Sequence, residues 1–103
     1  MNEIQRTLTG KQARYLRGLG HSLKPLLLVG KSGTTESFIK QLKSVLETHE
    51  LVKIKLGKTS PDDLKRTSEI ITAKTHCHVA QTIGKTLLLY KKREENPTIH
   101  LPR

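Results

Sequence analysis

The chain has 103 residues, of which 19 are Lys or Arg and 9 are Asp or Glu, and its formal net charge is +10. This length predicts one domain with a hydrophobic core that needs neither a metal ion nor a disulfide bond. So strong a positive balance is typical of proteins that bind polyanions. No predicted helix combines an aromatic face with a lysine-rich one, which disfavours a membrane surface and favours nucleic acid.

Cysteine content and the apolar runs predict the compartment. Cys77 is the single cysteine, so no disulfide bond can form within the chain and an oxidising compartment is not indicated. The N-terminal residues are too polar for a signal peptide. The longest apolar runs, at 26–29 and 87–90, are far shorter than the ~20 residues that span a bilayer. We expect a soluble, cytoplasmic protein.

A first helix and a first strand are predicted before residue 30. Thr9 is a suitable N-cap for a helix that runs to about Leu19. The apolar side of this helix is formed by Leu8, Leu16, Leu19 and Leu23. Its basic side is formed by Lys11, Arg14 and Arg17. Because there is no acid between Ile4 and Thr35, these basic side chains have no carboxylate to pair with along the helix. The apolar run at 26–29 predicts a buried strand.

The turn after this strand is the strongest candidate for a ligand site. Its sequence is Gly30-Lys31-Ser32-Gly33, a GxxG turn, and Thr34 and Thr35 lead from it into an amphipathic helix that starts at Glu36. Glycines at such a corner permit positive φ and close approach of the backbone. Several N–H groups and the positive end of the helix dipole can then face one phosphate, to which Lys31 adds a full charge. A turn whose glycines serve geometry alone is the alternative, and the uninterrupted positive charge before it disfavours that reading.

The remaining elements follow from periodicity and capping residues. In chain order they are a helix at 36–49, a strand at 51–56, a helix from Ser60 to about Thr75, and strands at 78–83 and 86–92. Ser60 is expected to cap the third helix, with Pro61 at its first position and the carboxylates of Asp62 and Asp63 complementing its dipole. Gly84-Lys85 has glycine first, as in a type II′ hairpin turn.

This order predicts an α/β chain of the α+β two-layer type, in which helices pack on a mixed four-stranded sheet. The first two strands, which a helix joins, should be parallel, and the hairpin strands should be antiparallel. Lys53 and Lys55 alternate with apolar residues on the second strand, so they extend the positive surface if that side of the strand faces solvent. We assign residues 1–93 to the domain and residues 94–103, which lack any period, to an irregular or mobile tail.

Three patterns suggest chemistry, and each has a better explanation. A nucleotide-binding P-loop that ends at Ser32 would need glycine at the position of Pro25. In His76-Cys77-His78 an extended backbone would place Cys77 opposite the two histidines, so at most two ligands converge, and Cys77 is better explained as a small buried residue. Ser32, His49 and Glu50 have the residue types of a hydrolytic triad, but no nucleophile-elbow sequence surrounds the serine. We predict no catalytic residues, no metal site and no cofactor.

Three stretches also support a family resemblance: Leu-Thr-Gly-Lys-Gln at 8–12, Val-Gly-Lys-Ser-Gly at 29–33 and His-Glu-Leu-Val-Lys-Ile at 49–54. With them the chain resembles, over nearly its whole length, the CRM domain family (chloroplast RNA splicing and ribosome maturation), in its single-domain bacterial YhbY type. The resemblance implies a fold similar to the C-terminal domain of bacterial initiation factor three, and RNA contact through the GxxG loop and the adjoining basic surface. The resemblance further implies that the protein is a ribosome-associated factor that acts in assembly of the large subunit. Thr34 departs from the family, which more often has an apolar residue there.

We therefore predict a non-enzymatic assembly factor that binds structured ribosomal RNA and the pre-50S particle, and that is a monomer. The predicted RNA-binding residues are Lys11, Arg14, Arg17, Lys24, Gly30, Lys31, Ser32, Gly33 and Thr34. Only three aromatic residues are present, so contacts to phosphate and RNA shape should outweigh base stacking. A general DNA-binding protein of the nucleoid type is the alternative, because the same charge would serve it.

Overall fold

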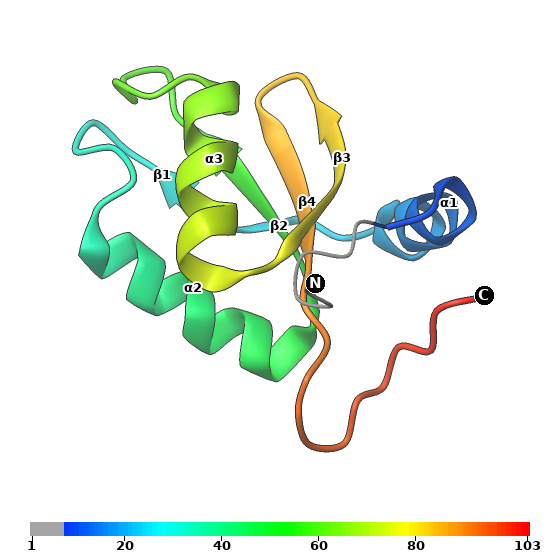
Figure 1. Ribbon diagram of the computed structural model, residues 1–103. Coiled ribbons are helices and arrows are strands. Elements are labelled where there is room, and N and C mark those ends of the chain that lie inside the picture. Colours follow the sequence, from blue (N-terminus) through cyan, green and yellow to red (C-terminus); the bar gives the residue numbers. More distant parts are fainter. Residues whose placement is uncertain (1–7) are drawn as a thin grey trace.

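The computed structural model describes residues 8–103, which form three helices and one mixed four-stranded sheet (Figure 1). In chain order the elements are α1 (Gly10–Gly20), β1 (Pro25–Val29), α2 (Glu36–His49), β2 (Leu51–Leu56), α3 (Leu64–Thr75), β3 (His78–Ile83) and β4 (Thr86–Tyr90). The strand order is β1-β2-β4-β3, with β1 and β2 parallel and the other neighbours antiparallel. The predicted α+β fold is confirmed.

The two faces of the sheet are covered unequally. On one face, α2 and α3 pack over the larger core cluster, in which alternate strand residues such as Val29, Ile54, Leu87 and Leu89 are buried. On the other face, α1 covers a smaller cluster built on Leu16, Leu51, Ala80, Leu88 and Tyr90. Because α1 lies against β2, β4 and β3, the face of β1 on this side of the sheet is not covered by a helix.

The packing of α1 depends on a glycine. The N-cap at Thr9 is confirmed, and Gln12 completes a capping box with it. A Cβ placed on Gly20 would lie 2.8 Å from both terminal carbons of Leu88, so the absence of a side chain is what lets the helix lie this close to β4. Leu19 and Leu23 were expected on the packed side of the helix, but they are exposed, because the contact is centred on Leu16 and Gly20.

The expectation that residues 26–29 form a buried strand is wrong for half of them. Leu27 and Val29 face the larger core, whereas Leu26 and Leu28 have 53% and 60% of their surface exposed. β1 is an edge strand, and α1 does not reach the face on which Leu26 and Leu28 lie. The apolar sequence of the strand alone does not show this. The strand therefore carries apolar side chains on a solvent-facing surface.

The start of the third helix also differs from the prediction. α3 begins at Leu64, and its N-cap is Asp63, whose carboxylate accepts a hydrogen bond from the N–H of Arg66 at 2.8 Å. Ser60 instead forms a local turn with Asp62. The hairpin has φ +57° at Gly84 and no positive φ at Lys85, as a type II′ turn requires, and β4 ends at Tyr90, two residues earlier than expected.

Residues 94–103 contain no helix or strand, but they are held against the domain. The side chain of Glu50 is fully buried, and it accepts hydrogen bonds from the N–H groups of Arg93, Thr98 and Ile99 and from the hydroxyl of Thr98, at 2.7–3.0 Å. Burial alone raises the pKa of Glu50, but these four donors outweigh it and bring the pKa down to about 2. Ile99 and Leu101 then pack against the smaller core cluster.

Candidate nucleic-acid interface

The GKSG turn (residues 30–33) projects from the C-terminal end of β1. The N–H of Gly33 donates to the carbonyl of Gly30 at 3.0 Å, which closes the turn and leaves the side chains of Lys31 and Ser32 exposed at its tip. No group within residues 8–103 accepts a hydrogen bond from the backbone N–H of Lys31 or Ser32. These two amides are therefore free to bind an anion, whereas that of Gly33 is used within the turn.

An internal carboxylate fixes the exit from this turn. The Oδ2 atom of Asp62 accepts hydrogen bonds from the N–H of Thr34 at 3.0 Å and from its hydroxyl at 3.1 Å. The side chain of Thr35 caps α2 by accepting from the N–H of Phe38 at 3.1 Å. The polar side chain of Thr34 thus has a specific partner. The sequence predicted that several N–H groups of the turn face an anion, but those of Gly33 and Thr34 are already bound, to Gly30 and Asp62.

The two glycines of the turn differ in what the fold demands of them. Gly33 has φ +79°, and a Cβ there would lie 2.9 Å from the carboxylate of Asp62, so both conformation and space require glycine. Gly30 has no positive φ, and a Cβ there would meet nothing within 4 Å. The protein itself leaves space beside Gly30, which allows a ligand to approach the backbone at that point.

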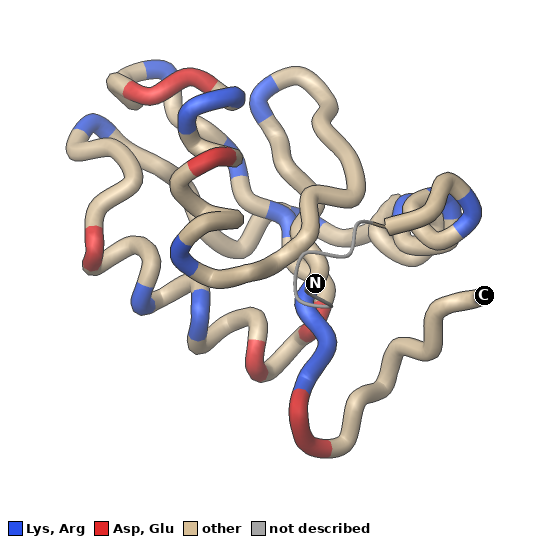
Figure 2. Tube along the Cα trace, viewed as in Figure 1, with Lys and Arg blue, Asp and Glu red and all other residues tan. Residues whose placement is uncertain are grey.

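The basic residues predicted to accompany the turn are spread over the molecule rather than gathered around it. Figure 2 shows the basic segments of α1 at the opposite side of the molecule from the GKSG turn. Lys24 precedes β1 and so is separated from Gly30 by the length of that strand, roughly 17 Å at the usual rise per residue. Of the nine predicted residues, the structure brings together only those at 30–34.

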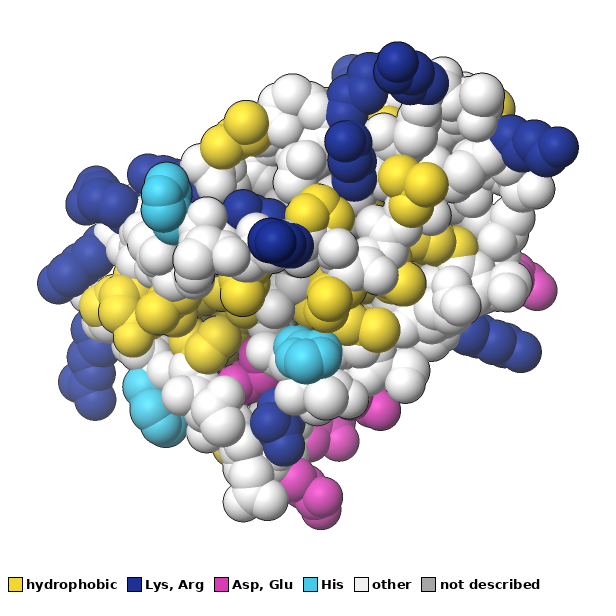
Figure 3. All heavy atoms as spheres, turned by 180° about the vertical axis from the view of Figure 1, so that it is seen from behind, with side chains coloured by type: hydrophobic (Ala, Val, Ile, Leu, Met, Phe, Trp, Pro, Cys, Tyr) yellow, Lys and Arg dark blue, Asp and Glu magenta, His cyan; other side chains and the backbone are white. Residues whose placement is uncertain are grey.

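A basic surface nevertheless spans that distance. Seen from behind (Figure 3), Lys and Arg side chains lie over α1, across the middle of the sheet and around the upper loops, with exposed hydrophobic side chains between them. Asp and Glu side chains appear mainly in the lower half of this face. Lys53 and Lys55 lie on β2 between the two predicted regions, and the side chain of Lys53 is partly exposed and that of Lys55 is exposed. These two lysines therefore place positive charge between the basic side of α1 and the GKSG turn.

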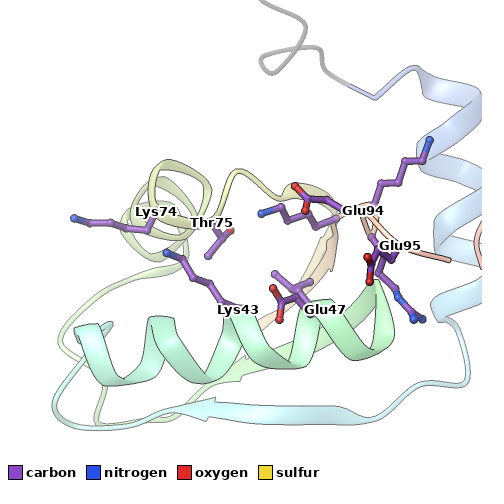
Figure 4. A pocket seen from close by; sticks show the side chains of 10 residues that line it. Lys43, Glu47, Lys74, Thr75, Glu94 and Glu95 are labelled. Atoms are coloured by element: carbon purple, nitrogen blue, oxygen red, sulfur yellow. The ribbon is translucent and has the colours of Figure 1, made fainter. Parts of the chain in front are cut away.

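A separate hollow of about 520 Å³ lies between α2, α3 and the segment after β4. It is lined by Lys43, Leu46, Glu47, Lys74, Thr75, Lys91, Lys92, Arg93, Glu94 and Glu95. Figure 4 shows the carboxylates of Glu47, Glu94 and Glu95 distributed along its wall among the basic side chains. Because three acidic side chains are mixed with the basic ones there, this hollow is a poorer site for a polyanion than the basic face of Figure 3.

The residues whose pattern suggested a metal site or a catalytic triad are either packed into the fold or far apart. Cys77 is buried, which raises the pKa of its thiol, and His78 stacks on Tyr90 with ring centroids 6.3 Å apart. Burial lowers the pKa of His78, and burial together with the charge of Glu50 raises that of Tyr90. Ser32 precedes α2 and His49 ends it, so the two are a helix length apart.

Within residues 8–103, no group of three or more His, Cys, Asp or Glu side chains is placed to hold a metal ion. In the same part of the chain, every helix is too short or too polar to cross a membrane.

The chain is similar to proteins of one family. The CRS1 / YhbY (CRM) domain model matches residues 8–91. YqeI of Bacillus subtilis, named as a probable RNA-binding protein, is 40% identical over 92% of this chain and 99% of its own length. A protein of Haemophilus influenzae named RNA-binding protein is 36% identical over 94% and 97%. The solution structure of the hypothetical protein SAV1595 from Staphylococcus aureus superimposes with a TM-score of 0.78, at 40% identity, over 93% of this chain and 100% of that one.

Proposed function

The chain belongs to the CRS1 / YhbY (CRM) domain family, and from this premise we propose that it is a non-enzymatic RNA-binding protein that acts in assembly of the large ribosomal subunit. Its ligand is structured ribosomal RNA within the pre-50S particle, which it binds as a monomer in the cytoplasm. The names of its relatives support RNA as the ligand. The net charge of +10 supports a polyanionic partner independently of them.

The observation that carries the proposed site is the combination of an open backbone and an exposed cation at one corner. Lys31 and Ser32 present amides without a partner in the described chain, at the positive end of the α2 dipole. Asp62 holds the loop in this conformation from the inner side, so the amides are ordered before a ligand arrives. One RNA phosphate binds there, accepting from the amides and pairing with the ammonium group of Lys31.

The remaining predicted residues make a second contact region on the same RNA. Lys11 and Arg14 are exposed on α1, Arg17 is partly exposed on the next turn, and Lys24 lies between this helix and β1. Because they are distant from the GKSG turn, they bind phosphates at a separate place along the RNA. A folded RNA large enough to cover this face of the molecule is thus the expected ligand, rather than a mononucleotide or a short single strand.

The substitution Lys31→Glu tests the site. We expect it to lower affinity for a transcript of large-subunit ribosomal RNA roughly tenfold or more, because it replaces a phosphate-binding cation by an anion. Its melting temperature should stay close to that of the wild type, since Lys31 is exposed. Lys40→Glu is the matched control, because it makes the same charge change at an exposed position on α2. Equal losses in both variants would remove the turn from the proposed site.

A competition experiment tests the identity of the ligand. Structured ribosomal RNA and duplex DNA of equal charge are titrated against the protein at the same salt concentration, so that the shared electrostatic contribution cancels. We expect the RNA to be preferred. Equal affinity for the DNA would instead support a general DNA-binding protein.

A further inference from the structure

Three loops that each carry one lysine meet at one end of the sheet, where β1, β2 and β3 finish. We call the rim that these loops form the three-lysine edge. They are the GKSG turn after β1, residues 57–63 after β2, and the Gly84-Lys85 turn between β3 and β4. β1 and β2 are parallel, and β3 also runs in their direction because β4 is antiparallel to both β2 and β3. The C-terminal ends of these three strands therefore lie together. Figure 2 shows a basic segment in each of the three loops at the top of the molecule.

Hydrogen bonds between the loops make this edge a rigid unit. The N–H of Gly57 donates to the carbonyl of Val29 at 2.9 Å, directly before the GKSG turn. The N–H of Leu56 donates to the carbonyl of Lys85 at 2.8 Å. Asp62 connects the second loop to the first through Thr34. The backbones that carry Lys31, Lys58 and Lys85 are thus fixed relative to one another, while all three side chains are exposed.

Below this edge lies a row of side chains that no helix covers. Leu28 pairs with Lys55, Lys55 pairs with Thr86, and Thr86 pairs with Ile83, so one residue from each strand lies in the row. Paired residues point to the same face of a sheet. Leu28 and Ile83 each have 60% of their surface exposed, whereas Leu88, the next residue on this face of β4, is buried under Gly20 of α1. α1 therefore ends short of this row.

The lysines of the edge form no ion pair with the carboxylates of the same loops, and they outnumber these carboxylates by three to two. Both carboxylates are engaged: Asp62 accepts from Thr34, and Asp63 caps α3. Among residues 8–103 the single ion pair joins Arg66 and Glu69, so no acid pairs with the exposed lysines of the edge and the row. A surface with apolar side chains among lysines that form no ion pair complements the sugar and phosphate groups of RNA better than an acidic or purely apolar protein surface.

We infer that this three-lysine edge, formed by Lys31, Lys58 and Lys85, together with the row Leu28, Lys55, Thr86 and Ile83, is a further RNA-binding surface continuous with the GKSG turn. The lysines bind phosphates of the RNA backbone. Leu28 and Ile83 contact the riboses of a shallow minor groove, where apolar contact does not need base stacking. The inference rests on the proposed function and adds Lys58, Lys85 and the uncovered row to its site.

The double variant Lys58→Ala with Lys85→Ala tests the phosphate contacts. Its affinity for the large-subunit ribosomal RNA transcript is measured by titration at several salt concentrations between 50 and 200 mM. We expect a loss of tens of fold near 0.1 M salt, and a slope of log affinity against log salt that is smaller by about 1.5 to 2, because two phosphate contacts are missing. Lys40→Ala with Lys43→Ala, which removes the same charge from α2, should leave the slope unchanged.

The double variant Leu28→Thr with Ile83→Thr tests the apolar contacts, since threonine keeps a good strand former at both positions. We expect a several-fold loss of affinity with an unchanged salt slope. If the wild type binds this RNA no better than duplex DNA, the proposed function itself fails. If Lys31→Glu binds weakly but the Lys58 and Lys85 variant keeps the wild-type slope, only the three-lysine edge is wrong. Loss of pre-50S association in the threonine variant with unchanged affinity for naked RNA would identify a ribosomal protein as the occupant, and would also overturn the inference.

Discussion

The two ends of the sheet use backbone amides around an anion in opposite ways. At the end where β2 begins, the fully buried carboxylate of Glu50 receives N–H groups from Arg93, Thr98 and Ile99, so the anion belongs to the protein. At the end where β1 and β2 finish, the amides of Lys31 and Ser32 have no partner among the described residues. The first arrangement contributes to folding stability, and the second remains available for a ligand.

Asp62 shows how the open end is kept open. Its carboxylate binds Thr34, directly after the turn, and does not reach the amides at the tip. The carboxylate of Asp62 thus accepts from Thr34 and leaves the N–H groups of Lys31 and Ser32 without a partner among the described residues. At Glu50, by contrast, the carboxylate binds all the donors that face it. The comparison predicts that changes at Glu50 affect stability and leave binding unchanged, whereas changes at the tip of the turn affect binding alone.

The largest expected effect is that of Glu50→Ala. It removes the acceptor of three partly buried N–H groups and of the Thr98 hydroxyl, which hold residues 93–99 against the domain, so we expect a loss of about 3 kcal/mol in the free energy of unfolding. Urea denaturation measures the loss. Glu47→Ala is the control, because Glu47 is an exposed glutamate on α2, the helix that Glu50 follows, and its loss should change the free energy by less than about 0.5 kcal/mol. A loss in Glu50→Ala no larger than in this control would show that the clamp on the tail contributes nothing to stability.

The second prediction concerns acid pH. The pKa of Glu50 is about 2 in the folded protein against an ordinary 4.5, so between these values the unfolded chain binds more protons. The stability that Glu50 contributes is therefore complete above pH 4.5 and is lost as the pH falls toward 2. We expect unfolding of the wild type in this window to take up as much as about one proton more than unfolding of Glu50→Gln. Parallel stability profiles for the two proteins between pH 4.5 and 2 would contradict the assignment.

Most of the fold could be predicted from local patterns, because capping residues and periodicity act within a few residues. The helix at 36–49 and the strands at 51–56 and 78–83 were predicted at the observed bounds. The tail could not be predicted, since Glu50 binds residues 43 to 49 positions further along the chain and nothing local marks that partnership. The exposure of Leu26 and Leu28 depends on β1 being an edge strand, which only the order of the strands decides.

For the candidate site, the sequence predicted the GKSG turn but not its neighbours. Lys58 and Lys85 lie far apart in the chain, and they share an edge with Lys31 only because β4 inserts between β2 and β3. Glycine was also hard to interpret: Gly20 indicates a weak helix end by propensity, yet it is needed for contact with Leu88. A glycine's purpose depends on what surrounds it in three dimensions, which composition does not show.

The smallest effects are expected from the two glycines of the turn, and they separate folding from binding most directly. Gly33→Ala should lower the free energy of unfolding by about 1 to 2 kcal/mol, because alanine is strained at φ +79° and its Cβ would crowd Asp62. Gly30→Ala should leave that free energy unchanged or raise it by a few tenths of a kcal/mol, since its φ is not positive and space is open around it. The same methyl group would lie where RNA approaches the backbone, so we expect Gly30→Ala to weaken RNA binding at full stability. Titration with the ribosomal RNA transcript alongside urea denaturation distinguishes the two roles. Unchanged binding by Gly30→Ala would mean that the ligand does not approach this part of the turn.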